Sequence, residues 1–293
     1  MSQKAEKTGM DPTVLVAMEE GFPAGQRIIS DDLAYELLPA GMKLTVKLMV
    51  KLLSIRPIRN WMINTSEKDI PGAWSGILAR KRYIDDKLTA KLSAVEAVVN
   101  LGAGFDTRLY RLPGVSKLPV WEIDQQNNIR LKQKQLQRVF NTFPPNTRLV
   151  ENDFDKTSVE DALLNNGYSF NMKTFFIEEG VTQYLTESAV NSIFENLRNT
   201  QAGSLFVFTY VRRDFIEGKS FYGWEKGYEK YVLKDKIWLS GKNPEEWPSF
   251  LKQYGWKVKE DIGAEELERK YTAPIGRAFG KLEVERIIFA EKE

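Results

Sequence analysis

The chain has 293 residues, a net charge of +2 at pH 7, and neither histidine nor cysteine. Disulfides, thiolate metal sites, cysteine nucleophiles, imidazole bases and Ser-His-Asp triads are therefore excluded, and we expect no metal site. Acidic and basic residues are interspersed, a pattern without a nucleic-acid footprint. The polar start, MSQKAEKTGMD, lacks an apolar signal region, and no stretch approaches the roughly 18 apolar residues of a membrane span. We expect a cytoplasmic globular protein that uses carboxylates, Arg, Lys, Tyr or a cofactor.

Residues 1–92 carry helical patterns and no convincing strand, so we expect an N-terminal helical cap. Ser30 and Asp31 are typical helix caps, and Pro39 would end the helix that they begin. The next stretch, GMKLTVKLMVKLLSI, spaces leucines and lysines by four residues along two helix faces. Three interpretations stay open for it: a helix with solvated lysines, a basic helix at a membrane surface, or a cover over an apolar substrate.

From about residue 93 the pattern changes to short apolar strands that alternate with helical stretches. The predicted strands are 97–101, 119–123, 147–151, 174–177 and 204–210. Apolar residues at helical spacing lie between them, as in QNNIRLKQKQLQRVF and ESAVNSIFENLRN. This alternation predicts a parallel sheet covered by helices on both faces.

The alternation breaks after Tyr210. Residues from about 211 to 250 are aromatic, charged and irregular, which favours a lid insertion over a core element. Two strand-like pieces, GWKVKEDIG and VERIIFAEK, follow and would close the sheet as an antiparallel pair. We therefore expect residues 93–293 to form an α/β domain with the lid inserted late in it.

The stretch VVNLGAGFDTRLYRL ends a strand in two glycines with an acid directly behind them. Ligands of open parallel sheets bind beyond the carboxyl ends of the strands, where glycines let the backbone approach closely. Gly102 and Gly104 would serve this purpose, although a tight turn without a ligand uses the same residues. A dinucleotide fingerprint needs a third glycine, but this chain has Arg108 at or near that position. A cofactor without a pyrophosphate therefore fits better.

Acidic residues end the next three strands. Glu122 and Asp124 share one face of the second strand, where a carboxylate commonly binds ribose hydroxyls. Asp153, after the third strand, would accept from an adenine amino group, with a turn or cap residue as the alternative. Glu178 and Glu179 adjoin each other after the fourth strand, and carboxylates at this place would suit a cationic sulfonium.

Several motifs follow one another along the chain: ILARKRYIDDKL, VVNLGAGFDTRLYRL, WEIDQ, NDF, EEGVTQYLTE, FLKQYGWKV and LERKYTAPIGR. Together they resemble the prokaryotic branch of the leucine carboxyl methyltransferase-like family of S-adenosylmethionine-dependent O-methyltransferases. The resemblance implies a class I methyltransferase fold, which is a Rossmann-like, seven-stranded, mostly parallel sheet with an N-terminal cap and a late insertion. It also implies S-adenosyl-L-methionine as the cofactor and S-adenosyl-L-homocysteine as its product.

The resemblance assigns the methionyl end of the cofactor to the first motifs. Arg80 matches the arginine that holds the methionyl carboxylate, for which a guanidinium fork is suited. Gly102 and Gly104 would line the methionyl segment, and Asp106 would lie near the amine. Glu179 is expected beside the amine and sulfonium.

The resemblance assigns the nucleoside and the acceptor to later motifs. Asp124 would take the ribose, with Glu122 as the second choice, while Asp153 and the backbone of Phe154 would bind adenine. Tyr184 would face the methyl group or the acceptor, which makes Tyr184 and Glu179 the catalytic candidates. The family usually has Leu in place of Phe154 and an apolar pair at 182–183, where this chain has Thr and Gln.

Methyl transfer from a sulfonium is an in-line displacement that needs alignment and exclusion of water. A carboxylate acceptor is already ionised at neutral pH and needs no base, which would suit a chain without histidine. We expect O-methylation of a carboxylate on a small molecule, with a hydroxyl as the second choice of acceptor group. The rest of the acceptor molecule is expected to be apolar or aromatic. A non-catalytic cofactor-binding protein and a nicotinamide-dependent oxidoreductase are the alternatives.

Overall fold

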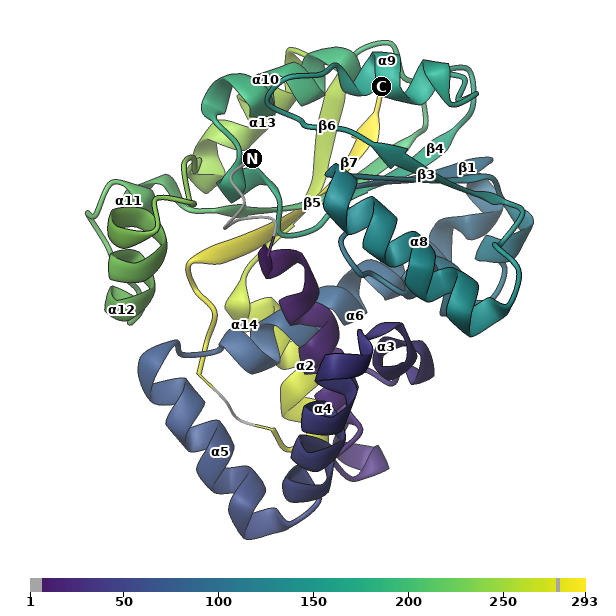
Figure 1. The fold of residues 1–293 in the computed structure, drawn as a ribbon. Coiled ribbons are helices and arrows are strands. Elements are labelled where there is room, and N and C mark those ends of the chain that lie inside the picture. Colours follow the sequence, from purple (N-terminus) through teal and green to yellow (C-terminus); the bar gives the residue numbers. More distant parts are fainter. Residues whose placement is uncertain (1–6, 278–279) are drawn as a thin grey trace.

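The computed structural model describes residues 7–277 and 280–293, which form a seven-stranded sheet. Figure 1 shows helices on both faces of this sheet. The strand order is β3-β2-β1-β4-β5-β7-β6. The strands are β1 (Ala97–Leu101), β2 (Val120–Asp124), β3 (Thr147–Glu151), β4 (Thr174–Glu178), β5 (Leu205–Val211), β6 (Trp256–Ile262) and β7 (Glu285–Lys292). Strands β1 to β5 are parallel, and β7 runs antiparallel to both β5 and β6.

The strand order reverses between β1 and β4, so the carboxyl ends of these two strands flank the topological switch point. All five residues of β1 and of β4 are buried, as expected for central strands with both faces covered. Val98 contributes to the core on one face and Val99 to the core on the other, because side chains alternate along a strand.

One face of the sheet is covered by α9 (Val159–Asn165), α10 (Glu187–Asn196) and α13 (Trp247–Lys252), which share an aromatic core with the strands. The other face is covered by α6 (Ala73–Lys91) and α8 (Gln126–Phe140). Helix α8 follows β2 and α10 follows β4, as the periodicity of the sequence predicted.

The helices before the sheet form the predicted cap: α2 (Asp11–Glu19), α3 (Asp32–Leu37), α4 (Ala40–Leu53), α5 (Arg56–Asp69) and α6. The side chain of Asp31 accepts hydrogen bonds from two backbone amides of α3, which confirms it as a cap. A segment between β6 and β7 packs against these helices and so forms part of the cap. It contains α14 (Ala264–Leu267) and the π-helix η8 (Glu268–Thr272), both of which lie beside α6. This second contribution to the cap was not predicted.

The predicted lid between β5 and β6 contains α11 (Arg213–Ile216), α12 (Glu225–Gly227) and the π-helix η6 (Tyr228–Lys234). Its aromatic side chains form a small core with Ala73 at the start of α6 and Leu282 before β7. The connections are completed by α7 (Arg108–Arg111) and the 3-10 helices η1 (Lys7–Met10), η2 (Ala24–Gln26), η3 (Leu92–Ala94), η4 (Val115–Lys117), η5 (Thr182–Tyr184), η7 (Pro244–Glu246) and η9 (Ala273–Ile275).

All seven predicted strands are present; β1 and β3 have the predicted bounds, and each of the other five differs by one residue at one or both ends. Within the described residues, no helix combines the length and the apolar character needed to cross a bilayer.

Candidate cofactor and acceptor site

The glycine turn after β1 is closely packed. Gly102 and Gly104 have positive φ angles of 71° and 43°, which side chains other than glycine rarely adopt. A Cβ on Gly102 would lie 2.2 Å from the side chain of Val181, and one on Gly104 would lie 2.7 Å from the carbonyl oxygen of Gly9. Both glycines are therefore required by the fold itself, whatever ligand binds beside them.

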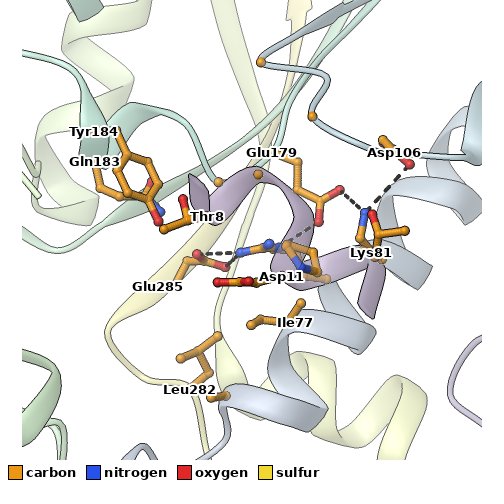
Figure 2. Close-up of a pocket in the computed structure, with 18 of the residues that line it drawn as sticks. Thr8, Asp11, Ile77, Lys81, Asp106, Glu179, Gln183, Tyr184, Leu282 and Glu285 are labelled. Carbon is orange, nitrogen blue, oxygen red and sulfur yellow. Dashed lines mark hydrogen bonds and ion pairs between the residues drawn. The ribbon is translucent and has the colours of Figure 1, made fainter. Parts of the chain in front are cut away.

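A cavity of about 180 Å³ opens at the carboxyl ends of β1 and β4, at the switch point (Figure 2). The turn 102–104, the loop 179–184 and the start of α6 form its walls, and the segment 8–13 covers it. Its apolar and aromatic lining residues include Ile70, Ala73, Ile77, Tyr184, Trp224, Tyr231, Trp238, Leu282 and Val284. The cavity thus joins the predicted cofactor loops to the predicted lid.

Glu179 is held in the cavity wall by three cations. Its carboxylate accepts hydrogen bonds from Arg80 Nε at 2.9 Å, Arg108 Nη2 at 2.6 Å and Lys81 Nζ at 3.3 Å. Burial alone raises the pKa of this carboxyl, but the three cations outweigh it and lower the pKa to about 2. Glu179 is therefore ionised at any physiological pH.

The guanidinium of Arg80 lies between two carboxylates. Its Nη1 atom donates to both oxygens of Glu285 at 2.8 Å, while Nε binds Glu179. The third nitrogen, Nη2, makes no hydrogen bond within the described residues and lies beside Gly180 at the cavity. Arg80 therefore keeps one donor for a ligand carboxylate.

Asp106 lies in the same network, on the side of the glycine turn. Its carboxylate is 2.6 Å from the guanidinium of Arg108 and 3.7 Å from Lys81 Nζ, and Figure 2 shows the contact with Lys81 at the cavity edge. Burial raises the pKa of Asp106, but Arg108 and Lys81 hold it well below its usual range. An ionised Asp106 therefore lines the cavity beside the glycine turn.

The two acids of β2 occupy different environments. Asp124 accepts from the backbone amides of Gly104 and Gln125, both at 2.6 Å, and from the Asn128 side chain at 2.9 Å. Glu122 is fully buried and is bound to Lys132 at 2.8 Å and to the hydroxyl of Tyr110. Both carboxylates are bound within the protein, but Asp124 ends β2 beside the glycine turn, whereas Glu122 lies two residues further back and is paired with Lys132 inside the core, so Asp124 is the stronger candidate for a ribose.

Asp153 and Phe154 lie outside the cavity. Asp153 borders a second, open hollow of about 370 Å³ at the ends of β2 and β3, together with Gln125. Phe154 is buried in the core beside this hollow. Gly9 lies against Gly104 and Asn128, so the first described residues separate the cavity from the hollow in which adenine was expected.

Tyr184 lies at the end of the cavity that faces the lid, and in Figure 2 its ring is close to Thr8. The ring meets that of Trp238 edge to face at a centroid distance of 6.5 Å. Burial raises the pKa of Tyr184, so its hydroxyl remains protonated at neutral pH and can donate a hydrogen bond.

Several charged residues in the cavity wall or directly behind it were not singled out as ligands from the sequence. Lys81 adjoins the predicted Arg80, and Arg108 follows the glycine turn; the structure makes both partners of Glu179. Glu285 and Asp11 lie far away in the sequence, at the start of β7 and of α2. Nothing in their local sequence marks them, because only the fold brings these elements to the cavity.

The profile of the family described as Leucine carboxyl methyltransferase matches residues 10–198, which is more than half of the chain. The chain belongs to this family. The match includes the glycine turn, the acids of β2 and β4, and Arg80, so the family expected from the motifs is confirmed.

Individual relatives agree with the family. The chain is 35% identical over 145 residues to YktD of Bacillus subtilis (strain 168), covering 48% of this chain and 47% of that protein. It is 28% identical over 194 residues to a protein of Mycobacteroides abscessus, covering 62% of each. The names of both assign them provisionally to the S-adenosyl-L-methionine-dependent methyltransferases. The matches thus span about half to two thirds of these relatives.

Solved structures confirm the fold. A protein from Thermobifida fusca YX, named provisionally as a methyltransferase, superposes with a TM-score of 0.56 at 13% identity, covering 80% of this chain and 88% of that chain. A DUF574 family protein from Streptomyces avermitilis superposes with a TM-score of 0.54 at 12% identity, covering 78% and 88%. The class I methyltransferase fold predicted from the sequence is therefore present, and the cofactor of the leucine carboxyl methyltransferase family is S-adenosyl-L-methionine.

Proposed function

We propose that this protein transfers the methyl group of S-adenosyl-L-methionine to an oxygen atom of a small molecule with an apolar or aromatic body, in the first instance to a carboxylate. The observation that supports this most is the composition of the cavity at the switch point. Its charged end, around Arg80 and Glu179, adjoins an aromatic wall supplied by Trp224, Tyr231 and Trp238.

The charged end fits the methionyl part of the cofactor. Four carboxylates and two cations line the cavity, namely Asp11, Asp106, Glu179, Glu285, Arg80 and Lys81. The excess of acids suits the ammonium and sulfonium groups of the cofactor. The unpaired Nη2 of Arg80 would bind the methionyl carboxylate, and Glu179 would face the sulfonium. Asp124 would take the ribose and Asp153 the adenine, on the side of the open hollow.

The protonation states favour an acceptor that needs no base. Glu179, with a pKa of about 2, is too weak a base to remove a proton from a hydroxyl, and a protonated Tyr184 is a donor. A carboxylate acceptor arrives ionised, and the Tyr184 hydroxyl would orient one of its oxygens towards the methyl group. The chain would then contribute alignment and exclusion of water, and the bound cofactor would supply the electrophilic methyl group.

A hydroxyl acceptor is the second candidate because of Asp11. Asp11 lines the cavity (Figure 2), and burial raises its pKa. A carboxylate with a raised pKa is a better general base than Glu179. Replacing Asp11 with Asn would therefore stop methylation of a hydroxyl, whereas methylation of a carboxylate would continue.

The first test is calorimetric titration of the protein with S-adenosyl-L-methionine and S-adenosyl-L-homocysteine. We expect micromolar binding that Asp124→Asn weakens by about tenfold or more, equal to about 1.4 kcal/mol. The matched control is Asp86→Asn, since Asp86 pairs with Arg82 on the exposed side of α6. Absence of heat from both ligands in folded protein would refute the proposal, and binding without turnover would support the non-catalytic alternative.

The second test identifies the acceptor atom. A panel of aromatic and apolar carboxylic acids and phenols is incubated with the cofactor, and the products are analysed by mass spectrometry before and after mild alkali. A methyl ester loses its methyl group in alkali as methanol, whereas a methyl ether keeps it. Alkali-stable products would shift the proposal from the carboxylate to the hydroxyl acceptor.

A further inference from the structure

The helical hairpin of α4 and α5 has an unusual charge distribution. Residues 40–66 contain five cations, Lys43, Lys47, Lys51, Arg56 and Arg59, and neither Asp nor Glu, although the whole chain has 42 basic and 40 acidic residues. Lys43 is paired with Glu36 of α3, and Arg59 is buried. The other three are exposed and have no ion pair within the described residues. This hairpin is therefore a local concentration of uncompensated positive charge.

The same hairpin carries exposed apolar side chains. Leu44 is 79% exposed, Leu48 53%, Ile55 48% and Trp61 68%. They are four of the seven large apolar residues that are exposed within the described chain. Large side chains of this kind normally avoid water when they occur together, so their grouping indicates an interaction surface.

The arrangement along the helices separates a buried face from this surface. Val46 and Leu53 of α4 and Ile63 of α5 are buried in the core of the cap. Leu44 and Leu48 lie one turn apart on the opposite side of α4. Lys47 and Lys51, also four residues apart, form a second row along α4 next to the two leucines. In Figure 1 the hairpin lies at the end of the cap that is remote from the sheet.

We propose that the α4–α5 hairpin docks onto the surface of an anionic lipid bilayer. Leucine and tryptophan side chains beside a row of lysines are typical of helices that lie in the headgroup region, where the apolar groups enter the acyl boundary. Lysine and arginine are attracted by anionic lipid headgroups. Trp61 has the amphipathic ring that is enriched at membrane interfaces.

Two other occupants of the surface fit the observations less well. A second copy of this chain, docked through the same face by two-fold symmetry, would bring together two hairpins whose residues 40–66 carry cations and no acid to pair with them. A nucleic acid would use the cations but would leave the exposed leucines without a partner. The lipid surface satisfies both the charges and the apolar groups.

The hairpin also leads directly to the cavity. Helix α5 ends at Asp69, and the next residues, Ile70 and Ala73, line the apolar side of the cavity together with Ile77 of α6. On the proposed function, an apolar acceptor that partitions into a bilayer would enter near the docked hairpin. This last step rests on the proposed function, whereas the docking itself does not.

The test is co-sedimentation of the full chain, without cofactor, with vesicles of phosphatidylcholine alone or mixed with phosphatidylglycerol. We expect binding to the mixed vesicles that decreases with salt and is lower by about tenfold or more on neutral vesicles. Leu44→Ser with Leu48→Ser, and separately Lys47→Gln with Lys51→Gln, should each reduce binding by a similar factor. Because these side chains are exposed, the variants should fold, which circular dichroism would verify.

Matched controls use exposed residues elsewhere. Leu164→Ser on α9 and Lys134→Gln on α8 remove an exposed apolar group and an exposed cation of the same types, and both should leave vesicle binding unchanged. Equal sedimentation with neutral and anionic vesicles, or equal losses in the controls, would overturn the proposal. Two further results would overturn the proposal. One is a dimer, detected by light scattering, that the leucine variants convert to a monomer. The other is binding to an RNA oligonucleotide that these variants abolish while vesicle binding is absent.

Discussion

At the scale of single residues, the carboxyl group of Glu178 lies buried at the end of β4. Glu178 is 1% exposed, and neither oxygen has a hydrogen-bond partner within the described chain. Burial raises its pKa from 4.5 to about 8. Its neighbour Glu179, which follows the strand and lines the cavity, has a pKa of about 2. The surroundings of these two adjacent acids thus shift their pKa values in opposite directions.

This difference predicts a specific pH dependence of stability. A carboxyl whose folded pKa exceeds its unfolded value stabilises the fold below about pH 4.5 and loses that contribution as the pH rises towards 8. We expect the free energy of unfolding to fall by at most about 3 kcal/mol between pH 6 and pH 9. Urea unfolding followed by tryptophan fluorescence would measure it, and no histidine or cysteine titrates in this window.

The control for this prediction is Glu178→Gln, which keeps the shape of the side chain and removes its ionisation. The variant should be the more stable protein at pH 9 and should show a much flatter dependence between pH 6 and pH 9. Parallel curves for the two proteins would mean that Glu178 ionises normally, contrary to its burial without partners.

The pair of Arg80 and Glu285 gives a second prediction at this scale. Removing one partner of a buried ion pair leaves an uncompensated charge and costs about 3–5 kcal/mol. We expect Arg80→Gln to lower the free energy of unfolding by about this amount, and Arg80→Gln combined with Glu285→Gln to recover part of the loss. A double-mutant cycle by urea unfolding would measure it, and strictly additive losses would contradict the coupling.

At the scale of elements, the lid divides its aromatic side chains between two tasks. Trp224 and Tyr231 line the cavity, whereas Tyr228 does not. The Tyr228 ring packs against Phe215 and Phe221, with centroid distances of 5.6 and 5.0 Å. The aromatic side chains of the predicted lid thus serve partly as lid packing and partly as cavity wall.

This division predicts different effects for two neighbouring tyrosines. Tyr231→Ala should lower kcat/KM for the acceptor by roughly 10-fold or more, as loss of a hydrophobic pocket contact does, without changing cofactor affinity. Tyr228→Ala is the matched control and should affect stability alone. Steady-state kinetics with the acceptor from the panel, together with calorimetry, would separate the two. Equal losses of kcat/KM in both variants would contradict the assignment.

Elements that depend on neighbouring residues in the chain could be predicted from the sequence. Strand alternation, the helix cap at Asp31 and the glycine turn are local features, and the structure contains them. Partners supplied by distant segments could not be predicted. Glu285 binds Arg80, which lies 205 residues away in the sequence. Glu122 is paired with Lys132 inside the core only because α8 turns the face that carries Lys132 towards β2. Such contacts follow from how helices pack, which periodicity alone does not specify.

At the scale of the whole molecule, the cap combines distant parts of the chain. Arg277 of the segment between β6 and β7 forms an ion pair with Glu19 of α2. Helix α6 packs against the other cap helices and also lines the cavity. The cavity wall therefore contains residues from the first and the last elements described. Ligand binding should stabilise the molecule as a unit, because it connects these parts.

This connection predicts a thermal shift. A cofactor at a hundred times its Kd adds about 2.7 kcal/mol, which corresponds to roughly 5–10 °C in Tm for a chain of this size. Differential scanning calorimetry with S-adenosyl-L-methionine should show this rise, and nicotinamide adenine dinucleotide should show none. A shift with the dinucleotide alone would favour the oxidoreductase alternative.

The contact of Gly9 with Gly104 has a kinetic consequence. The amide of Phe105 donates to the carbonyl of Gly9, and the Thr13 hydroxyl donates to the carbonyl of Phe105, so the first described residues are fastened across the glycine turn. A ligand long enough to reach from the cavity to the open hollow has to break these hydrogen bonds when it enters and again when it leaves. On the proposed function, the residence time of the spent cofactor, and with it the turnover rate, would be governed by how often residues 9–13 move away from the glycine turn.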